Sequence, residues 1–461
     1  MLTALVRRDG SSKFVDPNQF ATFPAFSLGW RISEENFLKG ATWLNDLKLR
    51  GSWGQLGNEA AVSASNAFTT FGSNRQSSWY DINGTQNSPV EGFYLSFTGN
   101  TLGQWETSTT ANYGFDATLF NGSTSIIFDY YTRNTDKLLY NPAGQAIQGA
   151  AAAKSPAFQN VGSMTNHGID LAITNRAKIT KDLILNTAIT FTTYTNKVTA
   201  ITQDGQQFFE VNSPLNEQNR IGAPVTRNIV GQPLNTYFGY KVLGLFQSAD
   251  EVSKSPTQTD AAPGRFKYAD IDGDGKITPN DRTVIGNPNP KFTYGINLGF
   301  EYKAFDLTGF FYGVSGKDAF NYTRWWTDFT PGTFPGGRSK DALYNSWLPD
   351  GSRPNAKTPM AELTPGTGFS DNTVVSSYYV ESASYFRLRN LQIGYTLPGS
   401  LVSKAKLSKV RIYIQGTNLF TVTNYTGINP EVTSSTDQTA GIDISSYPVV
   451  REYLVGASIV F

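Results

Sequence analysis

Carboxylates recur at every second position of one polar segment, at Asp270, Asp272 and Asp274. Gly275 follows them at the place where an EF-hand calcium loop makes its sharp turn. Oxygen ligands of this kind suit a hard cation, so the spacing predicts Ca²⁺ rather than a transition metal. In loop order, the predicted ligands are Asp270, Asp272, Asp274, the carbonyl group of Lys276, Thr278 (directly or through a water) and Asp281.

Asp281 stands at the twelfth position of this loop, where an EF-hand has a glutamate. Because the aspartate side chain is shorter, we expect it to reach the ion less well and the affinity to be low. The predicted role is a structural calcium that stiffens an exposed loop, for which millimolar calcium suffices. The alternative interpretation is an acidic turn that holds no metal.

The chain has almost no histidine or cysteine residues that could act in catalysis or bind a metal. His167 is the only histidine, and the chain has no cysteine, which excludes disulfides, thiolate metal sites and cysteine nucleophiles. The sequence contains no G-x-S-x-G, Walker A or G-x-G-x-x-G pattern. We interpret His167 as a polar residue at the head of a strand and expect no enzyme activity.

Aromatic pairs form a second group of candidate binding residues. The pairs that we single out for contact with a ligand or a partner protein are Trp79-Tyr80 and Trp325-Trp326. Flat rings stack on sugar faces, and rings with a polar atom also anchor partner proteins. An aromatic girdle or the core of a folded loop is the alternative interpretation, which also applies to Trp347, Tyr378 and Tyr379.

The elements that must position these residues are β-strands. Aromatic residues make up 13% of the chain and glycine occurs 43 times, which suits β structure with many turns. From Phe292 to Tyr302, apolar and aromatic residues alternate with small and polar ones, as in a strand with one apolar face. The segments predicted as strands are 2–8, 24–32, 44–54, 107–119, 123–133, 166–177, 182–194, 291–302, 304–315, 383–396, 407–417 and 450–461.

The connections between these segments alternate between longer and shorter. Such an alternation is typical of outer-membrane barrels, in which periplasmic turns are short and extracellular loops are long. The pattern therefore predicts an all-β protein, an antiparallel transmembrane β-barrel. Segment 237–246 also looks like strand, and we assign it to a small hairpin within a long loop. The predicted extracellular loops are 9–23, 55–106, 134–165, 195–290, 316–382 and 418–449.

The net charge and the first residues of the chain narrow the class of protein further. The net charge of +1 does not favour nucleic acid as a partner. No apolar run is long enough for a transmembrane helix. The first residues read as a strand rather than as an export signal, so we expect a longer protein of which this is the C-terminal part.

Several segments together resemble the SusC/RagA family of TonB-dependent transporters. They include Leu47-Lys-Leu-Arg-Gly-Ser-Trp-Gly54, the acidic loop region 268–290, Tyr385-Phe-Arg-Leu-Arg-Asn-Leu-Gln-Ile-Gly-Tyr-Thr-Leu-Pro398 and Gly416-Thr-Asn-Leu-Phe420. The resemblance spans the chain in order. It implies that residues 1–461 form the last 12 or so strands of a 22-stranded barrel, without the signal peptide, TonB box and plug of such transporters.

The family resemblance also implies a function in the outer membrane of Bacteroidetes-type bacteria. Members import oligosaccharides (glycans) or peptides, with a SusD-like lipoprotein as a lid and the TonB-ExbB-ExbD system as the energy source. The expected partners are thus the lid, the TonB system, the nutrient, membrane lipid and a second pair in a dimer of SusC–SusD pairs. A passive porin-like channel and a soluble all-β carbohydrate-binding protein are the alternatives.

Overall fold

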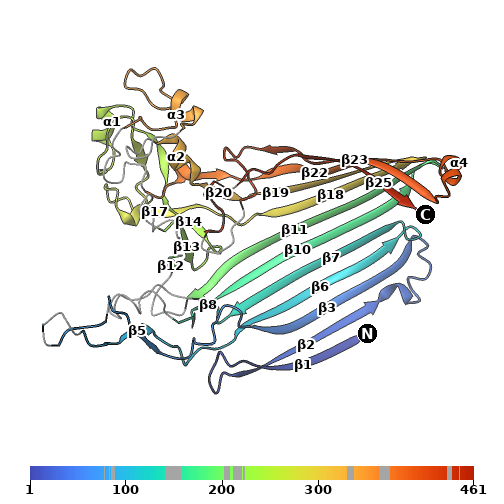
Figure 1. The fold of residues 1–461 in the computed structure, drawn as a ribbon, viewed down its shortest axis with the longest axis horizontal. Coiled ribbons are helices and arrows are strands. Elements are labelled where there is room, and N and C mark those ends of the chain that lie inside the picture. The colour runs from blue at the N-terminus through green and yellow to red at the C-terminus, as the bar shows by residue number, and fades with distance from the viewer. Residues whose placement is uncertain are drawn as a thin grey trace.

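One antiparallel sheet of 12 strands dominates the computed structural model (Figure 1). The structure describes residues 1–461 except 77, 83, 85–88, 141–156, 202–207, 211–220, 222–223, 330–336, 363–373, 433–438 and 446. Neighbouring strands follow chain order, and every predicted strand is confirmed. The strands are β1 (Leu2–Gly10), β2 (Phe20–Arg31), β3 (Leu44–Asn58), β6 (Glu106–Leu119), β7 (Thr124–Asp136), β10 (Gly162–Lys178), β11 (Leu183–Ile201), β18 (Phe292–Tyr302), β19 (Phe305–Ser315), β22 (Tyr385–Thr396), β23 (Lys409–Thr423) and β25 (Glu452–Val460).

The strand register sorts the side chains into an apolar face and a polar face. An apolar row crosses β25, β23, β22, β19, β18 and β11 through Val455, Ile414, Ile393, Leu307, Phe300 and Leu185. One position along, a polar row runs through Gln415, Gln392, Thr308, Gly299, Asn186 and Arg176. Because side chains alternate along a strand, the two rows lie on opposite faces of the sheet.

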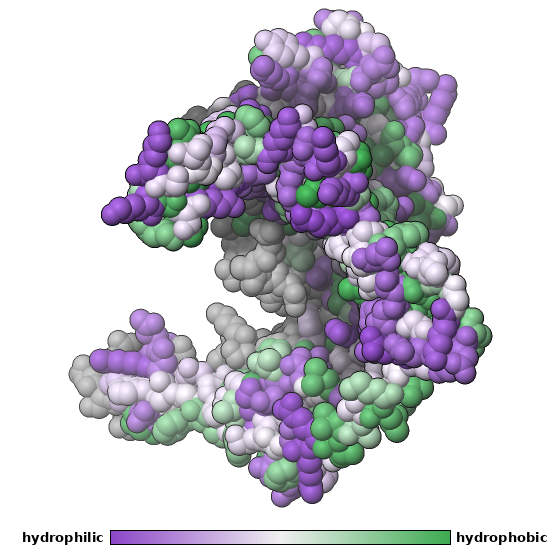
Figure 2. All heavy atoms as spheres, turned by 90° about the vertical axis from the view of Figure 1, so that its right-hand side faces the viewer, coloured by the Kyte–Doolittle hydropathy of each residue, from purple (hydrophilic) through white to green (hydrophobic). Residues whose placement is uncertain are grey.

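The sheet curves rather than lying flat. Viewed from the end that carries the short turns, the atoms form an open arc around a hollow (Figure 2). Ile414 is 55% exposed and Val455 is 77% exposed, so the apolar row has no protein to pack against. This is the arrangement of a barrel wall with an apolar outer face and a polar inner face. No described helix is long and apolar enough to cross a membrane.

Successive connections lie at opposite ends of the sheet, and from β3 onward the short ones gather at one end. Short turns join β2 to β3, β6 to β7, β10 to β11, β18 to β19 and β22 to β23, at the right-hand end in Figure 1. The β6–β7 turn passes through Asn121 and Gly122, both with positive φ, a conformation that these two residue types tolerate best. The connections at the other end carry additional elements, except the one between β1 and β2 (residues 11–19). That connection is shorter than the β2–β3 turn (residues 32–43), so the predicted order of longer and shorter connections is wrong for this first pair.

Three of the longer connections fold together into one unit, which we call the loop cap: the described residues of 202–291, 316–384 and 424–451. Its elements are β12 (Phe208–Glu210), β13 (Thr226–Ile229), β14 (Thr236–Tyr240), β15 (Val242–Leu245), α1 (Ala249–Lys254), β16 (Phe266–Tyr268), β17 (Arg282–Gly286), β20 (Asp318–Asn321), α2 (Thr323–Asp328), α3 (Lys340–Tyr344), β21 (Val380–Ser382) and β24 (Ile442–Asp443).

The loop cap has its own hydrophobic core. The buried members come from all three connections and include Tyr237 and Phe266, then Phe320 and Tyr379, then Ile442. Tyr237 also donates a hydrogen bond from its hydroxyl to the carbonyl oxygen of Gly441 at 2.7 Å. Segments more than 200 residues apart in the chain are therefore held as one body.

Segment 237–246 lies in small sheets within the long loop, and β14 forms an antiparallel hairpin with β13, as predicted. β14 pairs with β13 and β17, and β15 pairs with β16. The segment stays out of the large sheet, so successive connections still alternate between its two ends. The remaining elements are β4 (Thr70–Gly72), β5 (Tyr94–Phe97), β8 (Leu139–Tyr140), β9 (Gln159–Asn160), α4 (Gly399–Val402) and single 3₁₀ turns at Ile32–Glu34, Pro279–Asp281, Ser377–Tyr379 and Ser403–Ala405.

Candidate functional site

The acidic loop between β16 and β17 brings three carboxylates together. Oxygens of Asp270, Asp272 and Asp274 lie within 4.8 Å of one another. Two oxygens that each lie about 2.4 Å from one calcium ion can be at most about 4.8 Å apart, so the spacing fits Ca²⁺. Gly275 has a φ of +82°, which makes the turn possible without strain. These three residues and this glycine have the predicted arrangement, and calcium binding stays a prediction.

Asp281 occupies a different place in the loop from the other three carboxylates. It is fully buried, and its oxygens accept hydrogen bonds from the backbone N–H groups of Ile271 and Thr278, both at 2.7 Å, and of Asp272 at 3.4 Å. Burial alone would raise the pKa of Asp281, but the hydrogen bonds from Thr278, Ile271 and Asp272 outweigh it and hold the pKa below its usual value. Asp281 thus ties the two ends of the loop together.

The rest of the loop is anchored to the loop cap. Ile277 is buried in the cap core, and its N–H donates to the carbonyl oxygen of Thr257 at 2.8 Å. Thr278 caps the 3₁₀ turn that ends in Asp281, so its side chain has a structural role. The predicted ligand roles of Lys276, Thr278 and Asp281 stay predictions.

The aromatic pairs do not share one environment. Trp325 is only 4% exposed and its ring lies 5.0 Å from that of Trp326, edge to face. For Trp325 the structure favours the alternative interpretation, the core of a folded loop, because its ring has no open face for a ligand. Trp79 and Tyr80 are exposed, in the segment between β4 and β5. Contact with a ligand at Trp79, Tyr80 and Trp326 stays a prediction.

His167 lies in β10, paired with Thr195 on one side and Thr132 on the other. Its side chain is exposed, and it is not part of the carboxylate cluster of the acidic loop. The interpretation of His167 as a strand residue is confirmed.

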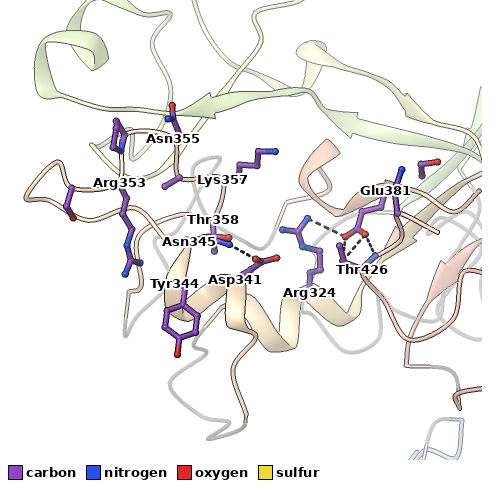
Figure 3. A pocket seen from close by; sticks show the side chains of 15 residues that line it. Arg324, Asp341, Tyr344, Asn345, Arg353, Asn355, Lys357, Thr358, Glu381 and Thr426 are labelled. Carbon is purple, nitrogen blue, oxygen red and sulfur yellow. Dashed lines mark hydrogen bonds and ion pairs between the residues drawn. The ribbon is translucent and has the colours of Figure 1, made fainter. Parts of the chain in front are cut away.

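A cavity of about 770 Å³ lies in the loop cap (Figure 3). Its wall includes Arg324 of α2, Asp341 of α3, Lys357 and Glu381. The segment just after β23 closes one side with Thr426, whose backbone N–H and hydroxyl both donate to Glu381 at 2.8 Å. Such a volume is in the range of small-ligand sites. The sequence does not reveal this cavity, because its wall is assembled from residues about 100 positions apart.

A family model described as the TonB dependent receptor-like β-barrel matches residues 1–419. The chain belongs to the TonB-dependent receptor family. It is 32% identical to TonB-dependent receptor P3 of Formosa agariphila, over the whole chain and 44% of that protein. It is 28% identical to TonB-dependent receptor SusC of Bacteroides thetaiotaomicron, over the whole chain and 42% of that protein.

Solved structures agree with this assignment. The structure of the RagAB peptide transporter superposes with a TM-score of 0.79 and 25% identity, covering the whole of this chain and 45% of that one. The resemblance to the SusC/RagA family is therefore confirmed. The chain spans less than half the length of the curated relatives it matches.

As a TonB-dependent receptor barrel, the chain is an outer-membrane protein and not an enzyme, since the family consists of transporters and receptors. The outer-membrane location predicted from loop lengths is confirmed, and the soluble carbohydrate-binding alternative is wrong. In such barrels the short turns face the periplasm. The loop cap of this TonB-dependent receptor, with its acidic loop and its cavity, therefore faces the outside of the cell.

Proposed function

We propose that the chain is part of an active importer that takes up oligosaccharides or peptides through the outer membrane. In this proposal a SusD-like lipoprotein acts as a lid over the loop cap, and the TonB-ExbB-ExbD system supplies the energy. The RagAB peptide transporter, which this chain resembles in structure, supports peptides as one substrate class. Oligosaccharides are the other class that the SusC/RagA resemblance implies. Two such pairs form a dimer in this proposal.

The observation that carries the proposal is the fusion of three long loops into one cap with a shared core. A passive pore needs an open mouth and gains nothing from a large folded body above it. A lid protein, by contrast, needs a preorganised surface on which to dock. The polar inner face of the sheet, with Gln392 and Asn186 among its residues, supplies a wetted wall for a hydrophilic cargo.

The test uses the full-length transporter in its own host. We expect uptake of a labelled oligosaccharide or peptide to disappear when the gene or the TonB system is deleted, and a surface lipoprotein to co-purify with the transporter. Uptake that continues without TonB, together with steady ion conductance of the purified protein in a planar bilayer, would instead identify a passive channel.

We also propose that the acidic loop holds a structural Ca²⁺ through Asp270, Asp272 and Asp274, with the Lys276 carbonyl and Thr278 completing the shell. Bound calcium stabilises the folded loop by mass action. We expect calcium to raise the melting temperature of the loop cap relative to EDTA, and Asp272→Asn to abolish that difference. Asp250→Asn, which removes an exposed carboxylate paired with Lys254, is the matched control. Equal melting in calcium and EDTA would exclude the site.

A further inference from the structure

The cavity in the loop cap has an unusual distribution of charge. Its wall holds three cationic side chains, Arg324, Arg353 and Lys357, and two acidic ones, Asp341 and Glu381. The wall is built from α2 and α3, the segment 352–358, β21 and the segment just after β23. Figure 3 shows Lys357 and Asp341 directed toward the side of the cavity where Arg324 lies.

Arg324 is held in place on the cavity wall. Its Nε donates to Asp328 at 2.9 Å, its Nη1 donates to the carbonyl oxygen of Tyr378 at 2.8 Å, and its guanidinium lies 3.8 Å from the centre of the Tyr378 ring. The second terminal nitrogen, Nη2, makes no hydrogen bond to the described residues. Arg324 already lies against two carboxylates, Asp328 at 2.9 Å and Glu381 at 3.5 Å. It therefore offers a ligand one ordered donor, Nη2, rather than an uncompensated charge.

The other two cations form no ion pair with a carboxylate of the described residues. Lys357 is exposed and makes neither a hydrogen bond nor an ion pair there. Arg353 donates only to backbone carbonyl oxygens, those of Leu343 and Ser346, each at 3.2 Å. Arg353 also lies near enough to Asp350 for the two charges to interact. Lys357 is therefore the cation that stands on the cavity wall without a described carboxylate beside it.

The two acidic side chains differ in the number of hydrogen bonds and ion pairs that they already make. Glu381 accepts from Thr426 and Asn321 and lies 3.5 Å from Arg324. Asp341 accepts only from Asn345, at 2.6 Å, and has no cationic partner among the residues described. The Asp341 carboxylate thus remains an acceptor for a hydroxyl or N–H group of a ligand.

We propose that this cavity binds a carboxylate flanked by hydrogen-bond donors. The carboxylate lies against Arg324 and Lys357, and the flanking hydroxyl or N–H group donates to Asp341. This inference rests on the proposed function, because it gives the chemical class of the imported substrate. The same chemistry occurs in a uronate-containing oligosaccharide and in a peptide with a free carboxylate, and the volume accommodates a short piece of either.

The experiment measures binding to the full-length transporter in detergent by calorimetry. The probes are trigalacturonate, neutral maltotriose, and a tetrapeptide with either a free or an amidated C-terminus. We expect a carboxylate probe to bind and Lys357→Gln to weaken it roughly tenfold, since charge-assisted bonds are the strong ones. Lys340→Gln, which removes an exposed lysine beside the cavity that does not line it, should leave affinity unchanged.

Each outcome bears on the proposal. Binding of trigalacturonate alone assigns the site to acidic glycans, and binding of the free but not the amidated peptide assigns it to peptides. Equal affinity for maltotriose, or no effect of Lys357→Gln, would overturn the carboxylate site. TonB-dependent uptake measured in the same variants separates the two proposals, because uptake that is unaltered in Lys357→Gln leaves the importer intact while removing this cavity from its mechanism.

Discussion

Replacing Asp281 by alanine tests whether this residue anchors the acidic loop or mainly holds a cation. The substitution removes the acceptor for the N–H groups of Ile271 and Thr278, both at 2.7 Å, and for the weaker bond from Asp272. Asp281 is fully buried, so water does not easily replace it. The loop should therefore open more readily even when no calcium is bound.

The size of the effect follows from the number of donors left without a partner. A buried N–H group without an acceptor costs about 1–3 kcal/mol. Only the donor of Thr278 belongs to a half-buried residue, and we discount the other two because Ile271 and Asp272 are exposed. Loss of about 1.4 kcal/mol, near the lower end of that range, makes the amides near Thr278 exchange with solvent on the order of tenfold faster.

Hydrogen–deuterium exchange of the full-length protein in EDTA measures this directly. The matched control is Asp274→Ala, which removes one exposed carboxylate of the cluster whose oxygen bonds only Lys276 N–H within the loop. We expect little change in the control when calcium is absent. Equal exchange in wild type and Asp281→Ala would refute the anchoring role.

The same anchor should be sensitive to acid. The pKa of Asp281 is lowered in the folded protein because the hydrogen bonds from Thr278, Ile271 and Asp272 outweigh the opposing effect of burial. A lowered carboxyl pKa gives stability that is complete above the unfolded value of about 4 and is lost as the pH falls through the folded value. Loop protection should therefore be constant from pH 7 to 5 and fall below about pH 4. Asp281→Asn should remove that dependence.

Substitutions at other positions test the contributions of the sheet, the loop cap and the inner wall one by one. Trp325→Ala leaves a void in the cap core, where Trp325 is 4% exposed, and should destabilise the cap by about 3–5 kcal/mol. Externally added trypsin should then cleave the cap while the barrel stays folded. Ile414→Lys puts a charge on the apolar face, at about 2–4 kcal/mol near the membrane midplane, and should lower the amount in the outer membrane. Gln415→Lys on the opposite face should not, and equal levels would contradict the assigned faces. Arg387→Met removes a buried cation that donates to Glu431 at 2.9 Å. The free energy of local opening of the segment after β23 should fall by roughly 1–3 kcal/mol, and its backbone amides should exchange with solvent faster.

The large sheet could be predicted from the sequence because its signals are local. In β18, apolar and polar residues alternate from Phe292 to Tyr302, and a strand with one lipid-facing side needs no distant partner to have that pattern. The lengths of the connections are equally visible along the chain. Together they determined the strands, their order, the membrane location and the side on which the long loops lie.

The loop cap could be decided only by the tertiary structure. Its core joins Phe266, Tyr378 and Ile442, which no periodicity connects, because short irregular segments gain stability from contacts with distant segments rather than from a repeating pattern. Trp325 and Trp326 look alike in the sequence, but one ring is buried and the other is partly exposed.

In the acidic loop, one feature could be predicted from the sequence and another depends on the tertiary structure. The spacing of Asp270, Asp272 and Asp274 predicted that their oxygens would converge, because a tight turn with glycine at positive φ brings alternate residues together. The sequence could not reveal that Asp281 turns inward to accept backbone N–H groups. That depends on burial against the cap, where a carboxylate is stable only if its oxygens are hydrogen-bonded. The spacing along the chain therefore determined which oxygens converge, and burial in the fold decided what the last carboxylate does.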